Sequence, residues 1–320
     1  MNQNLHKPKL LVTGADLAPQ PLALLTEFDV IYSGKTPSEE DIVALCREHN
    51  PTAVILRYSR IGAAAMDAAP ALQVISKHGS GTDTIDKVAA QERGIKVCAA
   101  VGANAAAVAE QALALLLACA KSIPHLNQRM HGGHWDKATF KTLELGGRTI
   151  GLVGLGAIGS RFARMVDAMG MRVLGHDPYA TKWPSQVQSV PLEAIWQQAD
   201  VISLHCPLTE DNRNLLNAET LARCKPGVIV INTARGGLVD EAALLSAVNS
   251  GQVRMAGLDS FAVEPVQPGH PFQGHDGFIL SPHIGGVTAD AYVNMGLGAA
   301  RNVLDALASQ APAVQKPAVV

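Results

Sequence analysis

A glycine-rich turn within residues 149–168 constrains the fold more than any other feature of the chain. The run "TIGLV" is typical of a buried strand, and "AIGSRFARMVDA" repeats apolar residues at helical spacing. Where the two runs meet, "GLGAIG" places Gly154, Gly156 and Gly159 in the pattern G-x-G-x-x-G. In this strand–turn–helix context, the pattern predicts a doubly wound parallel sheet of the Rossmann type that binds a dinucleotide.

Each residue of the turn has a physical role in that prediction. Gly154 permits the tight turn, Gly156 lets backbone N–H groups reach a pyrophosphate, and Gly159 lets helix and strand pack closely. Ala157 and Ile158 begin the helix, whose N-terminus adds a partial positive charge that favours the phosphates.

Asp177 ends the next expected strand, "MRVLGHD", about 20 residues after the glycines, where the pattern places an acidic residue. A carboxylate there accepts hydrogen bonds from both hydroxyls of the adenosine ribose and repels a 2′-phosphate. We therefore expect NAD as the cofactor in preference to NADP. His176 and Lys182 lie close in sequence and leave some use of NADP open.

Short aliphatic runs alternate with helical patterns along the whole chain, which is typical of parallel α/β architecture. We predict two doubly wound parallel-sheet lobes. A flavodoxin-like substrate domain is expected from residues 1–102 and 287–320, and a Rossmann NAD-binding domain from residues 103–286. The strands expected in the first lobe are "KLLVTG", "FDVIYSG", "TAVILRYS", "LQVISKHG" and "IKVCAA"; further strands of the second are "DVISLHC", "VIVINTA", "RMAGLD" and "FILSPH".

Local signals predict several helices and connections. Thr36 and Glu39 offer a capping box for a helix that ends near residue 49, with Pro37 in its first turn. Residues 103–121 are apolar on so many faces that the helix is expected to be buried between the lobes or to form a subunit interface. Residues 125–140 are expected to form a connecting loop. Residues 288–307 are expected to form a helix that returns to the first lobe, followed by a loose tail at 310–320.

Composition excludes several classes of protein. The net charge of −2 provides no basic field for nucleic acid or an anionic membrane surface. The longest apolar run, residues 112–120, is far shorter than a bilayer span, and the first residues lack the apolar segment of a signal peptide. Five cysteines without a C-x-x-C pair favour free thiols in a reducing compartment, and hence a cytoplasmic protein. His131 and His134 have no ligand partners at matching spacing, so no metal is expected.

The motifs together resemble the D-isomer-specific 2-hydroxyacid dehydrogenase family, which includes phosphoglycerate dehydrogenase and the glyoxylate/hydroxypyruvate reductases. The resemblance covers nearly the whole chain, and the order and spacing of its motifs agree. It implies a catalytic trio of Arg235, Glu264 and His283. The motifs that carry it are "KHGSGTDTID", "NAAAVAE", "GLGAIG", "HCPLT", "INTARGGLVDEAAL", "GLDSFAVEP" and "SPHIGG".

The chemistry of 2-oxo acid reduction argues for the same assignment. The planar guanidinium of Arg235, at a strand end, fits a carboxylate through two hydrogen bonds and polarises the keto oxygen. His283 titrates near neutral pH and can give a proton to that oxygen. Glu264 can fix the imidazole tautomer and raise its pKa by stabilising the charged form. The structural alternatives are a turn arginine, a solvated carboxylate and a buried histidine.

The resemblance implies further positions around these three. In the family, the backbone N–H groups of His78, Gly79, Ser80 and Gly81 hold the substrate carboxylate. The alternative for this stretch is an ordinary turn, with Thr82 or Asp83 capping a helix. Asn104 matches a family position near the interdomain cleft. The positions that line the cofactor in the family are Cys206, Thr233, Ala234, Asp259 and Gly286; for Cys206, a small buried residue is the better interpretation.

The identity of the 2-hydroxy acid stays open. Arg57 follows an expected strand and is a candidate cation for the distal group of the substrate, together with Arg60 and Lys77. Both arginines can equally be solvated charges at a strand end. The substrate is a small-molecule hydroxy or oxo acid, with 3-phosphoglycerate, glycerate or hydroxypyruvate, and another anionic hydroxy acid as alternatives. We also expect a homodimer, formed through the helix around residues 108–120.

Two other functions fit parts of the pattern. A formate or phosphite dehydrogenase would share the nucleotide motif, but formate oxidation needs no proton shuttle, so it explains the His283–Glu264 pairing less well. A non-catalytic NADH-sensing partner protein, like the transcriptional corepressors of the family, can retain the same trio. We favour the dehydrogenase over both.

Overall fold

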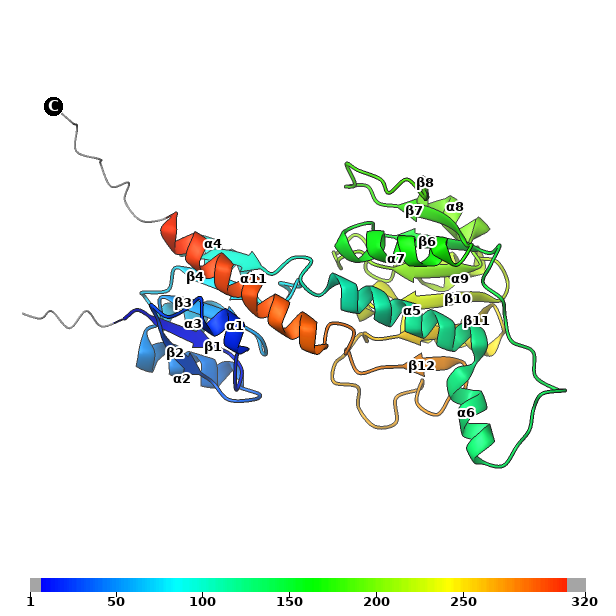
Figure 1. Ribbon diagram of the computed structural model, residues 1–320, viewed down its shortest axis with the longest axis horizontal. Coiled ribbons are helices and arrows are strands. Elements are labelled where there is room, and N and C mark those ends of the chain that lie inside the picture. The colour runs from blue at the N-terminus through cyan, green and yellow to red at the C-terminus, as the bar shows by residue number, and fades with distance from the viewer. Residues whose placement is uncertain (1–6, 310–320) are drawn as a thin grey trace, which may run out of the picture. The chain divides into compact units, whose positions relative to one another are not determined.

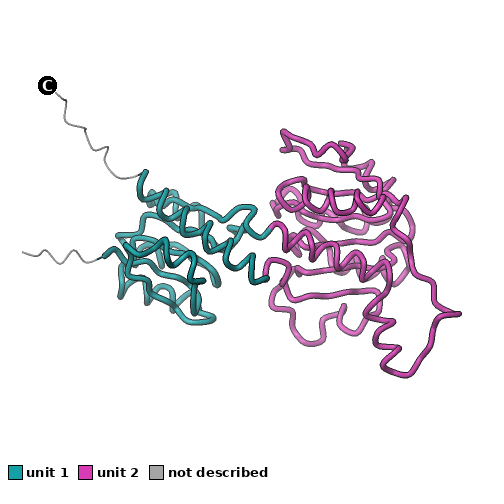
Figure 2. Tube along the Cα trace, viewed as in Figure 1, with its two compact units in different colours: residues 1–104, 288–320 teal, residues 105–287 magenta. Residues whose placement is uncertain are grey.

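The computed structural model describes residues 7–309, which divide into two compact units (Figures 1 and 2). Within the described residues, unit 1 comprises residues 7–104 and 288–309, and unit 2 comprises Ala105–Val287. The expected loose tail at 310–320 lies outside the described residues. Unit 1 is therefore formed by one segment that precedes unit 2 in the chain and one that follows it, whereas unit 2 is one continuous segment.

Unit 1 is built on a five-stranded sheet in which all neighbouring strands are parallel. Its order β2-β1-β3-β4-β5 is the flavodoxin-like order, so the predicted fold class is confirmed for this unit. The strands are β1 (Lys9–Val12), β2 (Asp29–Tyr32), β3 (Ala53–Leu56), β4 (Val74–Lys77) and β5 (Lys96–Ala99). The helices are α1 (Pro19–Leu22), α2 (Glu39–His49), α3 (Ala63–Asp67), α4 (Lys87–Glu92) and α11 (Ala289–Ala308).

Helix α11 belongs to unit 1 although it follows unit 2 in the chain. Figure 1 shows it lying across the sheet of unit 1, where it packs against β3, β4, β5 and α1. The small residues Ala299 and Ala300 and the branched Val303 are fully buried on the sheet with Leu10 and Ile55. This burial of an apolar helix face returns the end of the chain to the first unit.

The predicted capping box of α2 is wrong in its position. The helix begins at Glu39, and Ser38 is its N-cap. The Ser38 hydroxyl accepts a hydrogen bond from the Asp41 N–H, and the Asp41 carboxylate accepts one from the Ser38 N–H, at 3.1 and 2.9 Å. The box is therefore shifted by two residues from Thr36 and Glu39, because Ser38 and Asp41 offer the same reciprocal pair closer to the apolar run.

Unit 2 is built on a seven-stranded sheet, again with all neighbouring strands parallel. Its order β12-β11-β10-β9-β6-β7-β8 contains the Rossmann order, as the sequence predicts. The chain adds strands on one side of β6 up to β8 and then continues with β9 on the other side, so the strand order, and not the strand direction, reverses there. The strands are β6 (Thr149–Val153), β7 (Arg172–His176), β8 (Val187–Ser189), β9 (Val201–Leu204), β10 (Val228–Asn232), β11 (Val253–Leu258) and β12 (Phe278–Leu280). The helices are α5 (Ala105–Lys121), α6 (Ile123–His131), α7 (Ala157–Ala168), α8 (Leu192–Gln198), α9 (Ala218–Ala222), η1 (Gly236–Leu238) and α10 (Glu241–Asn249).

The apolar helix α5 packs against α7, β10 and β11 of its own unit. Its buried residues, such as Leu115, Leu116 and Cys119, contribute to one of the two cores of unit 2. Within residues 7–309 no single helix is long and apolar enough to cross a membrane; α5 and α6, which are bent by 60° at their junction, reach that length and composition only together. Burial within unit 2 thus accounts for most of the apolar character of α5.

The predicted connecting loop at 125–140 is wrong in its first half, which is helix α6. The helix carries a proline in its first turn and ends where Gly132 and Gly133 interrupt it, the latter at a φ of +80°. The two glycines suggest a loop throughout, but they only end the helix.

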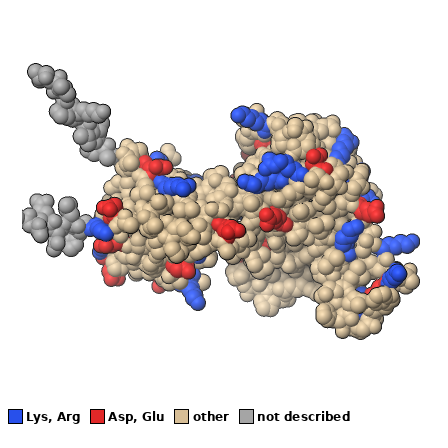
Figure 3. Space-filling model, viewed as in Figure 1, with Lys and Arg blue, Asp and Glu red and all other residues tan. Residues whose placement is uncertain are grey.

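On the surface, acidic and basic side chains are interspersed over the face shown in Figure 3.

Candidate active site

The glycine turn joins β6 to α7 at the carboxyl edge of the sheet of unit 2. Gly154 has a φ of +96°, and a β-carbon there would lie 2.7 Å from the Cys206 nitrogen and the His205 carbonyl carbon. A β-carbon on Gly159 would lie 2.2 Å from the Gly154 oxygen. A β-carbon on Gly156, the N-cap of α7, would meet nothing within 4 Å. Two of the glycines are therefore required for packing, and the third leaves the N-terminus of α7 open to a ligand.

Asp177 follows β7, the neighbour of β6, and lies beside this turn. One carboxylate oxygen accepts a hydrogen bond from the Leu155 N–H at 2.8 Å and the other from the Tyr179 N–H at 2.9 Å. Each oxygen keeps a further lone pair for a ligand hydroxyl. Nδ1 of the adjacent His176 lies 3.2 Å from the Val190 carbonyl oxygen. The carboxylate is thus held in place by one backbone group of the glycine turn and one of the segment that follows β7.

The other residues that the resemblance assigns to the cofactor all follow strands of the same sheet, and Gly286 lies furthest from its strand, in the loop after β12. The buried Thr233 hydroxyl has no hydrogen-bond partner among residues 7–309, which suits a ligand polar group. Burial raises the pKa of the Cys206 thiol to about 11, so it is a neutral packing group. These residues fit a dinucleotide at the strand ends: Cys206 after β9, Thr233 and Ala234 after β10, and Asp259 after β11.

Glu264 and His283 form a hydrogen-bonded pair in unit 2. Nδ1 of His283 lies 2.7 Å from Oε2 of Glu264, and Oε1 of Glu264 accepts a hydrogen bond from the Phe261 N–H at 2.9 Å. The hydrogen bond to Glu264 raises the pKa of His283 against the opposing effect of burial. Burial alone would raise the pKa of Glu264, but the hydrogen bonds from His283 and Phe261 and the charges of His283 and Arg235 lower it. The pair therefore favours an imidazolium beside a carboxylate.

Asp259 holds the loop that carries His283. Its buried carboxylate accepts hydrogen bonds from the Ser281 hydroxyl at 2.6 Å, the Ile284 N–H at 2.9 Å and the Gly285 N–H at 2.8 Å. His283 itself has a φ of +53°, a left-handed backbone conformation that residues other than glycine rarely adopt. The resemblance connected Asp259 only with the cofactor; the structure also shows it bonded to both sides of His283.

Arg235 lies in the turn after β10. The buried Asn232 organises this turn, because its side chain donates to the Arg235 carbonyl at 2.9 Å and accepts from the Ala234 N–H at 3.0 Å. A β-carbon on Gly236 would lie 1.8 Å from the Phe261 carbonyl carbon, so this glycine lets the turn touch the segment that leads to Glu264. Sequence reasoning missed Asn232, although a polar residue ending an apolar strand was a visible signal.

The predicted substrate loop, His78–Gly81, follows β4 in unit 1. The N–H of His78 donates to the Leu56 carbonyl at 2.9 Å, so it is already used within the sheet and is not available to a ligand. Only the later N–H groups of the loop therefore stay candidates for the substrate carboxylate. The Ser80 hydroxyl donates to the Asn104 side-chain oxygen at 3.0 Å, which links these two predicted positions. The alternative caps Thr82 and Asp83 are not used, since α4 begins after the N-cap Asp86.

The two arginines that follow β3 differ sharply. The side chain of Arg57 is only 10% exposed and its guanidinium pairs with Asp16 at 2.6 Å. Arg60 is 68% exposed and lies 3.5 Å from Glu39, as a solvated surface charge does. Of these two arginines, Arg57 is therefore the one that is buried and ion-paired within unit 1.

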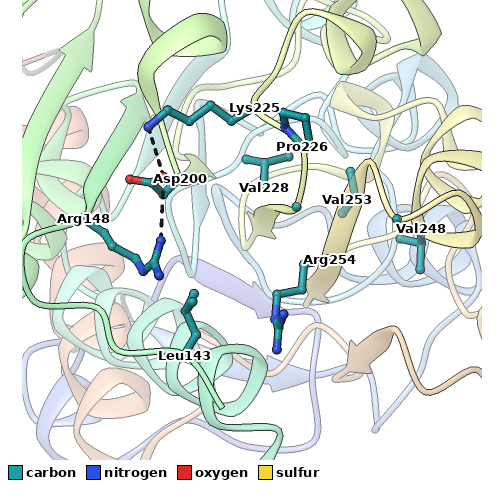
Figure 4. A pocket seen from close by; sticks show the side chains of 11 residues that line it. Leu143, Arg148, Asp200, Lys225, Pro226, Val228, Val248, Val253 and Arg254 are labelled. Carbon is teal, nitrogen blue, oxygen red and sulfur yellow. Dashed lines mark hydrogen bonds and ion pairs between the residues drawn. The ribbon is translucent and has the colours of Figure 1, made fainter. Parts of the chain in front are cut away.

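The described residues form no cluster of metal ligands, and one cavity of unit 2 lies at the sheet edge opposite to the glycine turn. Within residues 7–309, no group of three or more His, Cys, Asp or Glu side chains could hold a metal ion. A cavity of about 450 Å³ lies at the amino ends of the strands in unit 2 (Figure 4). There Asp200 accepts hydrogen bonds from Lys225 at 3.0 Å and the Thr149 N–H at 2.8 Å, and Arg148 lies 3.9 Å away. These interactions join the amino ends of β6, β9 and β10, at the sheet edge opposite to the glycine turn.

Comparison with known protein families and sequences identifies relatives. The family described as "D-isomer specific 2-hydroxyacid dehydrogenase, NAD binding domain" matches residues 113–285. Hydroxypyruvate reductase of Thermotoga maritima is 41% identical over 246 residues, which cover 76% of this chain and 80% of that protein. D-3-phosphoglycerate dehydrogenase of Mycobacterium tuberculosis is 37% identical over 298 residues, which cover 92% of this chain but only 56% of that longer protein.

Solved structures of related proteins have the same fold as this chain. A protein from Thermus thermophilus has a TM-score of 0.86 at 36% identity, covering 94% of this chain and 97% of that one. A glyoxylate reductase from Paecilomyes thermophila has a TM-score of 0.84 at 28% identity, covering 94% and 95%. The chain therefore belongs to the D-isomer specific 2-hydroxyacid dehydrogenase family and is a nicotinamide-dependent oxidoreductase.

Proposed function

We propose that this chain interconverts a 2-hydroxy acid of D configuration and its 2-oxo acid with NAD as the preferred cofactor. The observation that carries the proposal is the 2.7 Å hydrogen bond between Nδ1 of His283 and Oε2 of Glu264. Arg235 lies close enough to this pair for the charge of the arginine to lower the pKa of Glu264. A charged donor, its stabilising carboxylate and an arginine are what proton transfer to a 2-oxo acid requires.

In the direction of reduction, His283 donates the proton from Nε2 to the keto oxygen of the substrate. Glu264 holds Nδ1, so Nε2 is the nitrogen that faces the reaction, and the carboxylate stabilises the imidazolium. In the direction of oxidation, the neutral imidazole takes the proton back. The hydrogen bonds from the Ile284 and Gly285 N–H groups to Asp259 hold the loop in which the His283 backbone is left-handed. The imidazole is therefore oriented before substrate binds.

Arg235 binds the substrate carboxylate and polarises the keto oxygen. Its guanidinium offers two parallel N–H donors, the geometry that a carboxylate prefers. Within unit 1, the N–H groups of Gly79, Ser80 and Gly81 are the candidates that the family resemblance offers for a substrate carboxylate, and the Ser80 hydroxyl donates to the Asn104 side-chain oxygen. Unit 1 is on this proposal the substrate domain and unit 2 the dinucleotide-binding domain.

The residues that would hold the cofactor are those of the glycine turn, Asp177 and the strand-end residues of unit 2. The N-terminus of α7 stabilises the pyrophosphate, and Asp177 accepts the ribose hydroxyls. Thr233 brings its buried hydroxyl to the same edge of the sheet. When bound, the reduced nicotinamide supplies the hydride.

The test is oxidation of NADH by the purified chain with a panel of 2-oxo acids: glyoxylate, hydroxypyruvate, phosphohydroxypyruvate, sulfopyruvate and oxaloacetate. Turnover of at least one is expected. If none is reduced, the proposal fails. Oxidation of formate or phosphite would support the related dehydrogenases instead, and tight NADH binding without any turnover would support a sensor.

Substitution of Glu264 by glutamine is expected to change the pH dependence of the reaction. The glutamine cannot stabilise the imidazolium, so the raised pKa of His283 falls back and oxo acid reduction is lost at a lower pH. The alkaline limb of kcat/KM, which reports the free enzyme, should therefore move to lower pH. Glu241→Gln removes the carboxylate beside His270, 3.4 Å away, and is the matched control. An identical shift in both variants would contradict the role of Glu264.

Substitution of Asp177 by alanine is expected to weaken the preference for NAD. The variant loses the repulsion of a 2′-phosphate and the charge-assisted hydrogen bond to the 2′-hydroxyl, which is free only in NAD. One such bond corresponds to roughly tenfold to hundredfold in the NADH/NADPH ratio of kcat/KM. Steady-state kinetics with both cofactors measure this ratio. Equally poor use of NADPH by the variant and the wild type would refute this account of the carboxylate.

We further propose a homodimer in a reducing compartment such as the cytoplasm. Five free thiols support the compartment. For the dimer, the partly exposed residues of α5, such as Leu113 and Leu117, are the part of that helix still available to a partner. Sedimentation as a monomer at micromolar concentration would exclude the dimer.

A further inference from the structure

Arg57 is enclosed within unit 1 in a way that a simple substrate clamp does not require. Its guanidinium lies 5.2 Å from the centre of the Tyr58 ring and 4.8 Å from the centre of the Tyr292 ring. A β-carbon on Gly14 would lie 3.0 Å from Cδ and Nη1 of Arg57, so the glycine lets the arginine side chain lie against the backbone without a shift. The arginine is thus packed between two aromatic rings and the backbone, with 10% of its side chain exposed.

Asp16 covers the outer side of Arg57. Nη1 of Arg57 donates to both the backbone carbonyl and, at 2.6 Å, the Oδ1 of Asp16. The Tyr292 hydroxyl donates to the same Oδ1 at 3.0 Å. These two hydrogen bonds lower the pKa of Asp16, so it stays ionised. Because its side chain is 70% exposed, Asp16 and not Arg57 is the charged group that an approaching molecule meets.

This cluster borders the predicted substrate loop. Asp16, Arg57 and His78 follow β1, β3 and β4, which are adjacent in the sheet, so all three lie at its carboxyl edge. The Tyr292 ring lies 5.5 Å from the His78 ring and connects the cluster to the loop. Burial and the charge of Arg57 lower the pKa of His78 to about 4, so this histidine adds no positive charge. Beneath the cluster, Lys77 donates to the Arg57 carbonyl at 2.9 Å.

We propose that Asp16, held by Arg57 and Tyr292, selects the charge of the substrate's distal group. An exposed carboxylate accepts a hydrogen bond from an uncharged hydroxyl but repels a phosphate, and the pairing with Asp16 has already neutralised Arg57. The site therefore favours a hydroxymethyl-bearing oxo acid such as hydroxypyruvate over its phosphorylated counterpart. This inference rests on the proposed function and on the carboxylate binding at residues 79–81.

The test compares kcat/KM for hydroxypyruvate and 3-phosphohydroxypyruvate with NADH. The wild type should favour hydroxypyruvate. Asp16→Asn keeps the shape but removes the negative charge, and should shift the ratio towards the phosphorylated substrate by about tenfold, mainly through KM. Asp16→Glu restores the charge and should return the ratio towards that of the wild type. Asp67→Asn is the matched control, because Asp67 pairs with Arg93 at 2.7 Å in the same unit; its ratio should equal that of the wild type.

Two results would overturn the inference: a wild type that prefers the phosphorylated substrate, or an unchanged ratio in Asp16→Asn. If the wild type reduces neither compound nor any other 2-oxo acid, it is the proposed function that fails. Selection by Asp16 is then read from calorimetric binding of D-glycerate and D-3-phosphoglycerate. Tighter binding of the phosphorylated acid by the wild type than by Asp16→Asn would overturn the selection on its own.

Discussion

Replacement of His283 by alanine is expected to lower kcat for oxo acid reduction by roughly 10²–10⁴-fold, the range for a positioned acid–base group. The variant leaves Glu264 and Arg235 in place but removes the only proposed proton donor to the keto oxygen. Because Arg235 still binds the carboxylate, KM should change far less than kcat. Steady-state oxidation of NADH with the best substrate of the panel measures both constants.

Two further variants separate proton transfer from backbone effects at this position. His283→Asn tolerates the left-handed conformation at φ +53° but carries no titrating proton, so it should be as inactive as the alanine variant. His49→Ala removes another histidine paired with a glutamate, Glu48 at 3.6 Å, and should leave turnover unchanged. Recovery of most activity in His283→Asn would show that the backbone conformation, and not the imidazole, is essential.

Replacement of Arg235 by lysine is expected to lower kcat/KM by roughly tenfold to thousandfold. The positive charge remains, but the ammonium cannot form two parallel hydrogen bonds, each of which is worth about 1.5–3 kcal/mol when a charged group is involved. Since the same guanidinium polarises the keto oxygen, kcat should fall along with a rise in KM. The measurement is a substrate titration with NADH at saturation.

Arg223→Lys is the control for this change of side chain, because Arg223 forms an exposed pair with Glu193 at 2.9 Å in the same unit. Thermal unfolding of both variants tests whether the turn held by Asn232 remains folded. A variant Arg235→Lys that is stable and fully active would remove the arginine from the proposed carboxylate site.

Most of the architecture could be predicted from sequence because its signals are local. The glycines of residues 154–159 and the apolar runs on either side specify a strand, a turn and a helix without reference to distant residues. The errors are local as well. Ser38 replaced Thr36 as a cap because two adjacent stretches offer similar chemistry, and helix α6 was missed because Gly132 and Gly133 lie at its end.

The sequence by itself determined the fold class, the nucleotide turn and the identity of the residues proposed for catalysis. Only the tertiary structure decided how these residues meet. Glu264 and His283 are 19 positions apart, and the loop between them brings their side chains to 2.7 Å. Asp16 and Arg57 are 41 positions apart and Tyr292 comes from a helix that the chain adds last. Such contacts depend on which strands become neighbours in the sheet, and hydrophobic periodicity along the chain does not encode that.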